Sequence, residues 1–235
     1  MLKAEPKPEI EALADQGPVD FRIRQVERGD KAGIDYTTEL HMELLGFGPM
    51  AQFGPQVIRE TIYVTAINEG LLEVAIAEVN GRPAGFIAYT TDPHRFHSSL
   101  IRPHLFKVMR VMATALITQP GRLRYVPRAM KVVFSRDDLG ENADKAGTEV
   151  VCFGVRPEYL TAEFVRKTKI RVGVKLLQHA ANYFRQHNFD STRMIVDADN
   201  TRALLFYQSL GGEMTACTFG GVPSYIVHME LDNLF

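Results

Sequence analysis

RMIVDADNTRALLFYQSLGG, residues 193–212, is the stretch around which the rest of the chain is organised. Its apolar run at 194–196 predicts a strand over 193–198, and Asn200 follows at a position that caps a helix. The helix is indicated by residues that recur every three or four positions, namely Ala203, Leu204, Tyr207 and Leu210. Gly211 ends it, because a residue without Cβ adopts the left-handed turn at little cost. The sequence therefore predicts a strand, a cap, a short helix and a glycine stop.

One face of this helix is suited to a ligand. Asn200, Ala203 and Tyr207 stand three and four positions apart, so a side-chain amide, a small residue and a phenol share that face. The pattern of Asn, two residues, Ala, three residues, Tyr, three residues, Gly resembles the last cofactor-binding motif of the GCN5-related N-acetyltransferases, the GNAT superfamily. The resemblance implies that Asn200, Ala203 and Tyr207 border acyl-CoA and that the Tyr207 hydroxyl protonates the departing thiolate. On the residues alone, Tyr207 is also consistent with a half-buried aromatic whose hydroxyl meets water.

Length and composition fit one globular domain. The chain has 235 residues, of which 46% are hydrophobic and 23% charged, so it can bury a full core. We expect the domain to span 20–235, after a loosely held arm at 1–19. The two cysteines, Cys152 and Cys217, lie in apolar runs and are expected to be buried small hydrophobes in a reducing compartment. With no signal-peptide core and no membrane-spanning run, the sequence predicts a cytoplasmic protein.

The net charge of −1 hides an uneven distribution. Residues 93–136 contain nine Lys and Arg and no Asp or Glu, which leaves 18 cations against 28 acids in the remainder. This basic segment defines a predicted helical insertion at about 94–140. Three interpretations stay open: a lid that holds an anionic acceptor, a solvated helix pair used for packing or for a homodimer, and a surface for an anionic membrane or an acidic carrier protein. Nucleic acid is disfavoured, because the body is net negative and no binding module is recognisable.

The other elements indicate an α+β domain. Strand patterns lie at 20–27, 148–155, 213–219 and 225–231, and a hairpin turns at Asn80-Gly81. Helical patterns lie at 31–45, 55–68, 104–118 and 173–187. The resemblance implies the GNAT fold, with three α/β/α layers and a mixed, mostly antiparallel twisted sheet of about seven strands. Helices are expected on both faces of that sheet, with the helical insertion added.

The strand at 148–155 ends in Arg156-Pro157-Glu158-Tyr159, which resembles the end of the fourth GNAT strand. In that family the fourth strand splays from the fifth, and acyl-CoA lies between them. The resemblance therefore implies that Phe153 and Val155 border the cofactor. A backbone N–H near Val155 would then hydrogen-bond the thioester carbonyl and stabilise the oxyanion that forms on attack.

The start of the helix at 173–187 resembles, at one position, the GNAT loop that binds pyrophosphate. Successive N–H groups at a helix N-terminus face the phosphates there, and glycine allows close approach. The resemblance assigns this role to Thr168, Lys169, Arg171, Val172, Gly173 and Val174, of which only Gly173 matches the family pattern. The segment 157–168 is longer than the usual short turn of the family. A helix start without a ligand is the alternative.

By resemblance, the reaction is transfer of an acyl group, most simply acetyl from acetyl-CoA, to a primary amine of a small acceptor of the amino-sugar or amino-acid type. The basic insertion favours an anionic acceptor. Another acyl-CoA with a longer chain, or a non-catalytic acyl-CoA-binding sensor or scaffold, are the alternatives. No metal is implied, because the histidines are scattered and form no pair of zinc-ligand spacing.

An amine acceptor with a pKa near about 10 is mostly protonated at neutral pH, so a base must take a proton before attack. Glu149 is the first candidate, because its strand is expected to border the cofactor. Asp197, at the end of the next strand, and His97, in the insertion, are the others.

Overall fold

The computed structural model describes residues 19–48, 50–99, 105–127 and 147–235. The expected arm at 1–19 lies almost wholly outside these residues, as does the second half of the insertion at 128–140. No helix in the described ranges is both long and apolar enough to cross a membrane. The same ranges hold no group of three or more His, Cys, Asp or Glu side chains arranged to bind a metal ion.

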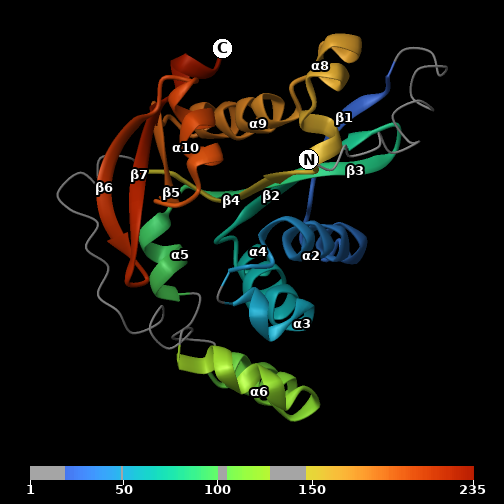
Figure 1. Cartoon of the computed structure of the whole chain (residues 1–235), viewed down its shortest axis with the longest axis vertical. Helices are drawn as coiled ribbons and strands as arrows, with labels where there is room; N and C mark the ends of the chain where they lie inside the picture. Colours follow the sequence, from blue (N-terminus) through green and yellow to red (C-terminus); the bar gives the residue numbers. More distant parts are fainter. Residues whose placement is uncertain (1–18, 49, 100–104, 128–146) are drawn as a thin grey trace, which may run out of the picture.

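A single seven-stranded sheet with the strand order β1-β2-β3-β4-β5-β7-β6 forms the middle of the molecule (Figure 1). The strands are β1 (Phe21–Gln25), β2 (Glu73–Val79), β3 (Arg82–Thr90), β4 (Glu149–Val155), β5 (Ser191–Asp197), β6 (Glu213–Phe219) and β7 (Val222–Glu230). All neighbouring strands are antiparallel except β4 and β5. Asn80 and Gly81 both have positive φ in the β2–β3 hairpin, as a tight turn that matches strand twist requires.

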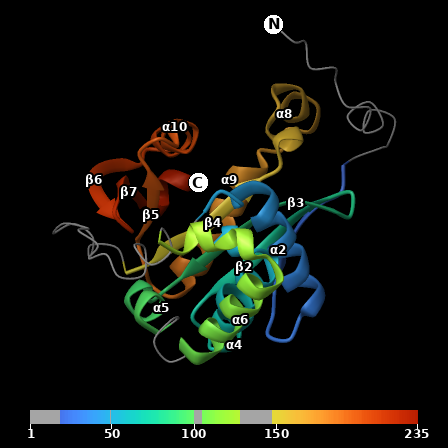
Figure 2. The same cartoon turned by 60° about the horizontal axis from the view of Figure 1, so that its bottom comes forward.

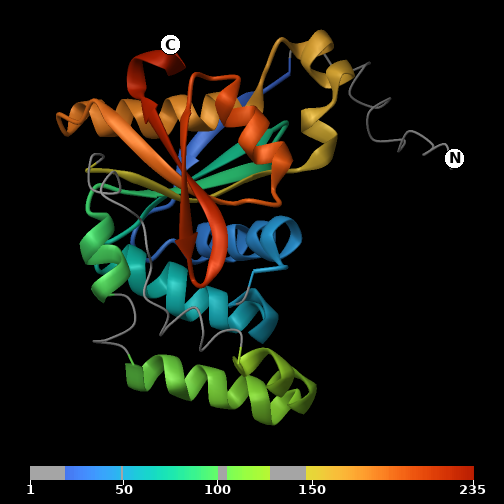
Figure 3. The same cartoon turned by 60° about the vertical axis from the view of Figure 1, so that its left-hand side comes forward.

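Helices cover both faces of the sheet (Figures 1 and 3). One face carries α8 (Ala162–Thr168), α9 (Val172–Gln186) and α10 (Thr201–Gln208), and the other carries α2 (Lys31–Leu45), α3 (Pro55–Val57), the π-helical η2 (Ile58–Val64) and α4 (Thr65–Asn68). Two hydrophobic clusters fill the spaces between the sheet and these helices. The predicted α+β class with three α/β/α layers is therefore confirmed.

Most predicted boundaries agree with the structure to within a few residues. Asp30 caps α2 by accepting a hydrogen bond from the Gly33 amide at 2.9 Å, and this helix has the predicted bounds. The predicted helix at 55–68 is one continuous helix whose middle, η2, has π-helical pitch. The segment 157–168, expected to be longer than a short turn, folds into η5 (Pro157–Leu160) and α8.

The insertion begins with α5 (Pro93–Ser99), α6 (Leu105–Thr118) and the 3₁₀ turn η3 (Pro120–Tyr125). Figures 1 and 3 show α6 on the side of the α2–α4 helices that is turned away from the sheet, and Figure 2 shows it in front of them. A small apolar cluster joins it to α3 and to η1 (Ala51–Phe53), with Phe53, Val57 and Ala115 at its centre. The described part of the insertion therefore adds a further helical layer below α3.

Candidate active site

The parallel strands β4 and β5 separate after two residue pairs. Glu149 pairs with Arg193 and Val150 with Met194, and the register ends there although both strands run on, to Val155 and Asp197. We call the unpaired region between 151–155 of β4 and 195–197 of β5 the gap. The predicted splay of these two strands is thus confirmed.

A β-bulge lies at the start of the gap. On the other edge of β4, Cys152 pairs with Ala88 and Val150 pairs with Tyr89, so Val151 has no partner residue on β3. A bulge bends its strand and increases the local twist. The bend explains why β4 leaves β5 at this point and not at its end.

Backbone amides of β4 point into the gap. The Arg156 amide donates to the Ala84 carbonyl oxygen on β3 at 2.9 Å, and successive residues of a strand direct their N–H groups to opposite edges. The amides of Val155 and Phe153 therefore point away from β3 and toward β5, beyond the last residue pair of the two strands. Such amides can donate to a carbonyl oxygen placed between the strands.

The N-terminus of α9 lies at the same end of the sheet. Its first internal hydrogen bond runs from the Lys175 amide to the Arg171 carbonyl at 3.0 Å, so the three preceding amides have no helical acceptor. No side chain caps this helix and its first turn carries no acidic residue. The partial positive charge of the helix end is thus available to an anion.

Comparison with solved structures covers nearly the whole chain. PaiA N-acetyltransferase from Thermoplasma acidophilum, solved in complex with coenzyme A, is 12% identical with a TM-score of 0.52 over 90% of this chain and 99% of that chain. A putative acetyltransferase of the GNAT family from Desulfovibrio desulfuricans is 12% identical with a TM-score of 0.51 over 91% and 99%. PH1933 from Pyrococcus horikoshii is 14% identical with a TM-score of 0.54 over 90% and 98%. The chain has the GNAT fold. No family model and no curated protein matches the sequence.

Within this GNAT fold, the predicted phosphate-binding residues lie around the start of α9. Lys169 and Arg171 are exposed, and Lys169 makes the turn between α8 and α9 in the left-handed conformation, with φ of 60°. The Thr168 hydroxyl is engaged locally, because it donates to the Phe164 carbonyl and accepts from the Ile170 amide. Val172 is fully buried and Val174 half-buried, so only their backbones are suited to a ligand.

Gly173 lies against two aromatic rings, which leave little room for a side chain at this position. A Cβ at this position would lie 3.2 Å from Cζ of Phe153 and 3.5 Å from Cζ of Phe206. These two rings, from β4 and α10, are stacked with their centroids 5.9 Å apart and their planes at 16°. The Phe153–Phe206 stack therefore joins β4, which borders the gap on one side, to α10, the helix that follows β5 on the other side. Sequence reasoning missed Phe206, which carries no polar group and differs from other apolar residues only by standing next to Tyr207.

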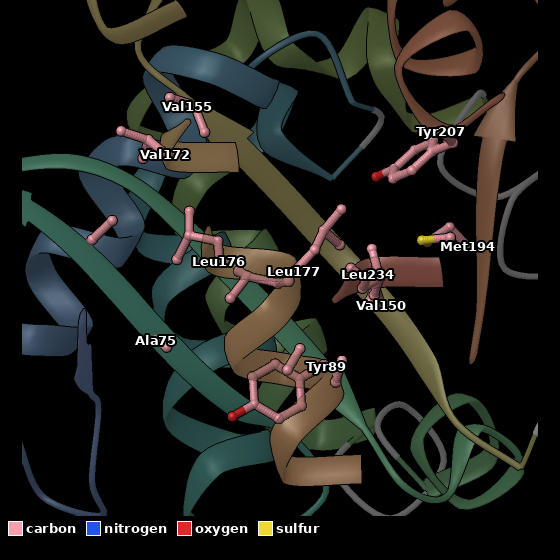
Figure 4. Close-up of a cluster of buried hydrophobic side chains, with 14 of the residues drawn as sticks. Ala75, Tyr89, Val150, Val155, Val172, Leu176, Leu177, Met194, Tyr207 and Leu234 are labelled. Carbon is pink, nitrogen blue, oxygen red and sulfur yellow. The ribbon is translucent and has the colours of Figure 1, made fainter. Parts of the chain in front are cut away.

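Tyr207 is buried, with 5% of its surface exposed. In Figure 4 its hydroxyl points from α10 toward β4, above Met194. Its ring lies 6.4 Å from that of Phe153 and 5.4 Å from that of Phe206, centroid to centroid. Burial, and secondly the nearby Cys152, raises the pKa of the Tyr207 phenol, so it keeps its proton at neutral pH.

The other residues of the Asn-Ala-Tyr face lie nearer to solvent. Asn200 is exposed, and its Oδ1 caps α10 by accepting from the Ala203 amide at 3.2 Å, which confirms the predicted cap. Ala203 is half-buried on the first turn. Asn200 thus orders the helix that carries Tyr207.

The three candidate bases have different surroundings. Glu149 is ion-paired with Arg193, with Nε and Oε2 at 2.9 Å and both side chains 3% exposed. Asp197 is half-buried at the end of β5, on the open side of the gap. His97 belongs to α5, but its side chain lies outside the described part of the structure.

The expectation that both cysteines are buried is wrong. Cys152 and Cys217 are free thiols of intermediate exposure. Cys152 packs at the margin of the hydrophobic cluster between the sheet and the α2–α4 helices, and Cys217 lies on the edge strand β6. The protein around Cys152 nevertheless raises the pKa of its thiol to about 12, first by burial and then through Glu149.

Proposed function

We propose that the chain is an acyl-CoA-dependent N-acyltransferase that moves an acyl group, acetyl in the simplest case, to a primary amine of a small acceptor. The separation of β4 from β5, with the Val155 amide directed between them, is the observation that carries this proposal. Sheets rarely leave such amides unpaired, because a backbone donor without a partner is costly once it is removed from water. A thioester carbonyl between the strands would supply the missing acceptor.

The thioester supplies an electrophilic carbonyl carbon, and the residues of the chain act around it. The amine nitrogen forms a bond to that carbon while the carbon–sulfur bond breaks. The amides of Val155 and Phe153 donate to the carbonyl oxygen as negative charge develops on it. A base takes one proton from the ammonium before the attack. The Tyr207 hydroxyl gives its proton to the sulfur as the thiolate leaves, and the second proton, which the nitrogen loses as the amide forms, restores the phenol.

The uncapped start of α9 suits the pyrophosphate of CoA. The amides of Val172, Gly173 and Val174 are free of helical acceptors, and exposed Lys169 and Arg171 flank them in sequence. Backbone donors and the helix dipole favour a phosphate group at this position. The phosphate groups would then lie at the end of the gap near Val155.

The position of Asp197 is suited to a general base, since it is the last residue of β5, at the end of the gap where the two strands are unpaired. Glu149 lies at the paired end, and it can accept a proton only by weakening its ion pair with Arg193. His97 stays a candidate from the sequence.

The acceptor that we favour is a small anionic amine, of amino-sugar or amino-acid type. The support is the basic segment 93–136, which would attract an anion and repel a basic peptide. An acyl-CoA with a longer chain is an alternative donor.

A non-catalytic acyl-CoA sensor is a second candidate. The burial of Tyr207 and the Phe153–Phe206 stack favour it. The rings of Phe153 and Phe206 would have to move before a pantetheine arm could reach the Tyr207 phenol. A sensor would need that movement for signalling and would need no general acid.

Calorimetric titration with acetyl-CoA, CoA and longer acyl-CoAs, followed by turnover over a panel of amines, tests these proposals. We expect binding of acyl-CoA and release of free thiol with at least one small amine. Binding without turnover would favour the sensor. Absence of binding by every donor would remove both the enzyme and the sensor.

A further inference from the structure

A second polar site lies away from the gap, on the insertion. A pocket of about 350 Å³ opens between η1 and the η3 turn. It is lined by Gln52, Gln119, Gly121, Arg122, Arg124 and Tyr125. Since α6 and η3 pack below α3, on the side turned away from the sheet, this pocket is separate from the β4–β5 gap (Figure 3). We call it the insertion pocket.

The Arg122 guanidinium is held in place by uncharged groups. Its Nη1 donates to the Phe53 carbonyl oxygen at 2.5 Å. The guanidinium also lies over Gly54, where a Cβ would come within 2.6 Å of both terminal nitrogens, and the Gly54 φ of +101° admits little but glycine. Arg122 is therefore oriented before any ligand arrives, with donors left over for a partner.

Arg124 lies beside it and is also oriented by a neutral neighbour. Its Nη2 donates to the Tyr125 hydroxyl at 2.6 Å, and its Cζ lies 4.7 Å from the centroid of the same ring. Within the described residues, neither Arg122 nor Arg124 forms an ion pair with a carboxylate. Other arginines of the same molecule do so, among them Arg59 with Asp35 and Arg156 with Glu43.

We propose that the insertion pocket binds a small-molecule oxyanion, with a phosphate or carboxylate group held between Arg122 and Arg124. Guanidinium groups bind both kinds of oxygen through paired, charge-assisted hydrogen bonds. Gln52 and Gln119 add side-chain amides to the lining. Gln52 Nε2 donates to the Gly46 carbonyl oxygen at 2.6 Å, which holds this side chain in place and leaves its Oε1 as an acceptor for an uncharged part of the ligand. The segment 93–136, which supplies five of the six lining residues, contains no Asp or Glu. The site is independent of the proposed acyl transfer.

The test is a titration of the full-length, isotope-labelled protein with inorganic phosphate and, separately, with succinate, at constant ionic strength set with chloride. We expect saturable shifts of the Gly121 amide and of the Arg122 and Arg124 Nε signals in NMR spectra. Saturation by phosphate alone identifies a phosphate site, and saturation by both anions identifies a general oxyanion site. Either result supports the proposal, whereas linear shifts without saturation for both anions overturn it.

Variants separate a built site from general attraction by a basic surface. Arg124→Gln should weaken binding at least tenfold while the protein stays folded, because Arg124 contacts only its neighbour Tyr125. The matched control is Arg110→Gln, an exposed cation of α6 that does not line the pocket. Arg122→Gln is the second variant, read together with its unfolding midpoint, since it loses the bond to Phe53. Equal weakening by Arg124→Gln and Arg110→Gln would show non-specific attraction and overturn the proposal.

Discussion

Glu149 and Arg193 form an ion pair across the first of the two residue pairs that join β4 and β5. Their backbones are opposite each other in the register, Nε lies 2.9 Å from Oε2, and both side chains are almost fully buried. The next residue pair is the final one before the strands separate. A buried ion pair therefore holds β4 and β5 together one residue pair before the gap begins.

This ion pair gives the first prediction. Glu149→Gln should destabilise the protein by about 3–5 kcal/mol, because it removes the buried carboxylate that pairs with the Arg193 guanidinium at 2.9 Å. The double variant Glu149→Gln, Arg193→Met should recover most of that loss, as measured by urea unfolding. Turnover by the double variant also tests the base. Activity near that of wild type would show that Glu149 is not the proton acceptor, and stability unchanged in the single variant would contradict the structural role.

Tyr207→Phe tests the proposed general acid. We expect kcat to fall about 100-fold with little change in KM for acetyl-CoA, since proton donation acts on the leaving group and not on binding. Tyr36→Phe, at a side chain 44% exposed on α2, is the matched control. Because burial raises the pKa of Tyr207, the wild-type rate should show no loss near pH 10 from this phenol. An unchanged kcat for Tyr207→Phe across pH would remove the role.

The Phe153–Phe206 stack gives a prediction about binding. If the stack closes the path to Tyr207, Phe206→Ala opens it, and affinity for acetyl-CoA should rise several-fold even if stability falls. Leu205→Ala, at the preceding and 60% exposed position of α10, should leave affinity unchanged. Calorimetry measures both. Weaker binding by Phe206→Ala would mean that the ring contacts the ligand directly and does not obstruct it.

A large side chain at position 173 should be destabilising. Its Cβ would stand 3.2 Å from Phe153, so Gly173→Val should cost about 1–3 kcal/mol of stability through overpacking. CoA affinity should also fall, because the start of α9 would be pushed away from β4. Gly121→Val, where a Cβ meets nothing within 4 Å, is the control for stability. Equal unfolding midpoints for the two variants would contradict this account.

The fifth prediction concerns acid stability. Burial lowers the pKa of His41 from its usual 6.5 to about 4, and its Nδ1 lies 2.7 Å from the hydroxyl of the buried Tyr63. The unfolded chain therefore binds a proton between pH 6.5 and about 4 that the folded protein resists. Stability present above pH 6.5 should be lost as the pH falls through this window, by a total of about 3 kcal/mol. Urea unfolding of wild type and His41→Asn from pH 7.5 to 4.5 measures it, and a difference independent of pH would refute it.

Local patterns were sufficient to predict most of the fold. The bounds of α2 follow from Asp30, whose side chain caps the helix, and the β2–β3 turn follows from Asn80 and Gly81. The splay of β4 from β5 was predicted through the resemblance carried by the end of the strand at 148–155 and the residues Arg156-Pro157-Glu158-Tyr159 that follow it, and it is confirmed. These features depend on residues close together in sequence or on a motif with fixed spacing.

The details of the candidate site could not be predicted in this way. The Glu149–Arg193 ion pair and the Phe153–Phe206 stack each join residues more than 40 positions apart, and the sequence does not specify which residues of two parallel strands face each other. The bulge at Val151 has no marker such as glycine. Cys152 was expected to be buried because its neighbours are apolar, and the sequence does not show that it packs at the margin of a cluster and not inside it.

One extra residue in β4 lies at the point where β4 and β5 separate. Val151 is the only member of β4 that is skipped by the ladder with β3, so shortening the strand by this single position would make the ladder continuous while Phe153 and Val155 kept their orientation. A straightened β4 could then run alongside β5 to its tip, and the Val155 amide would find a carbonyl of the chain itself. The opening in which we propose that a thioester binds therefore depends on the length of one strand.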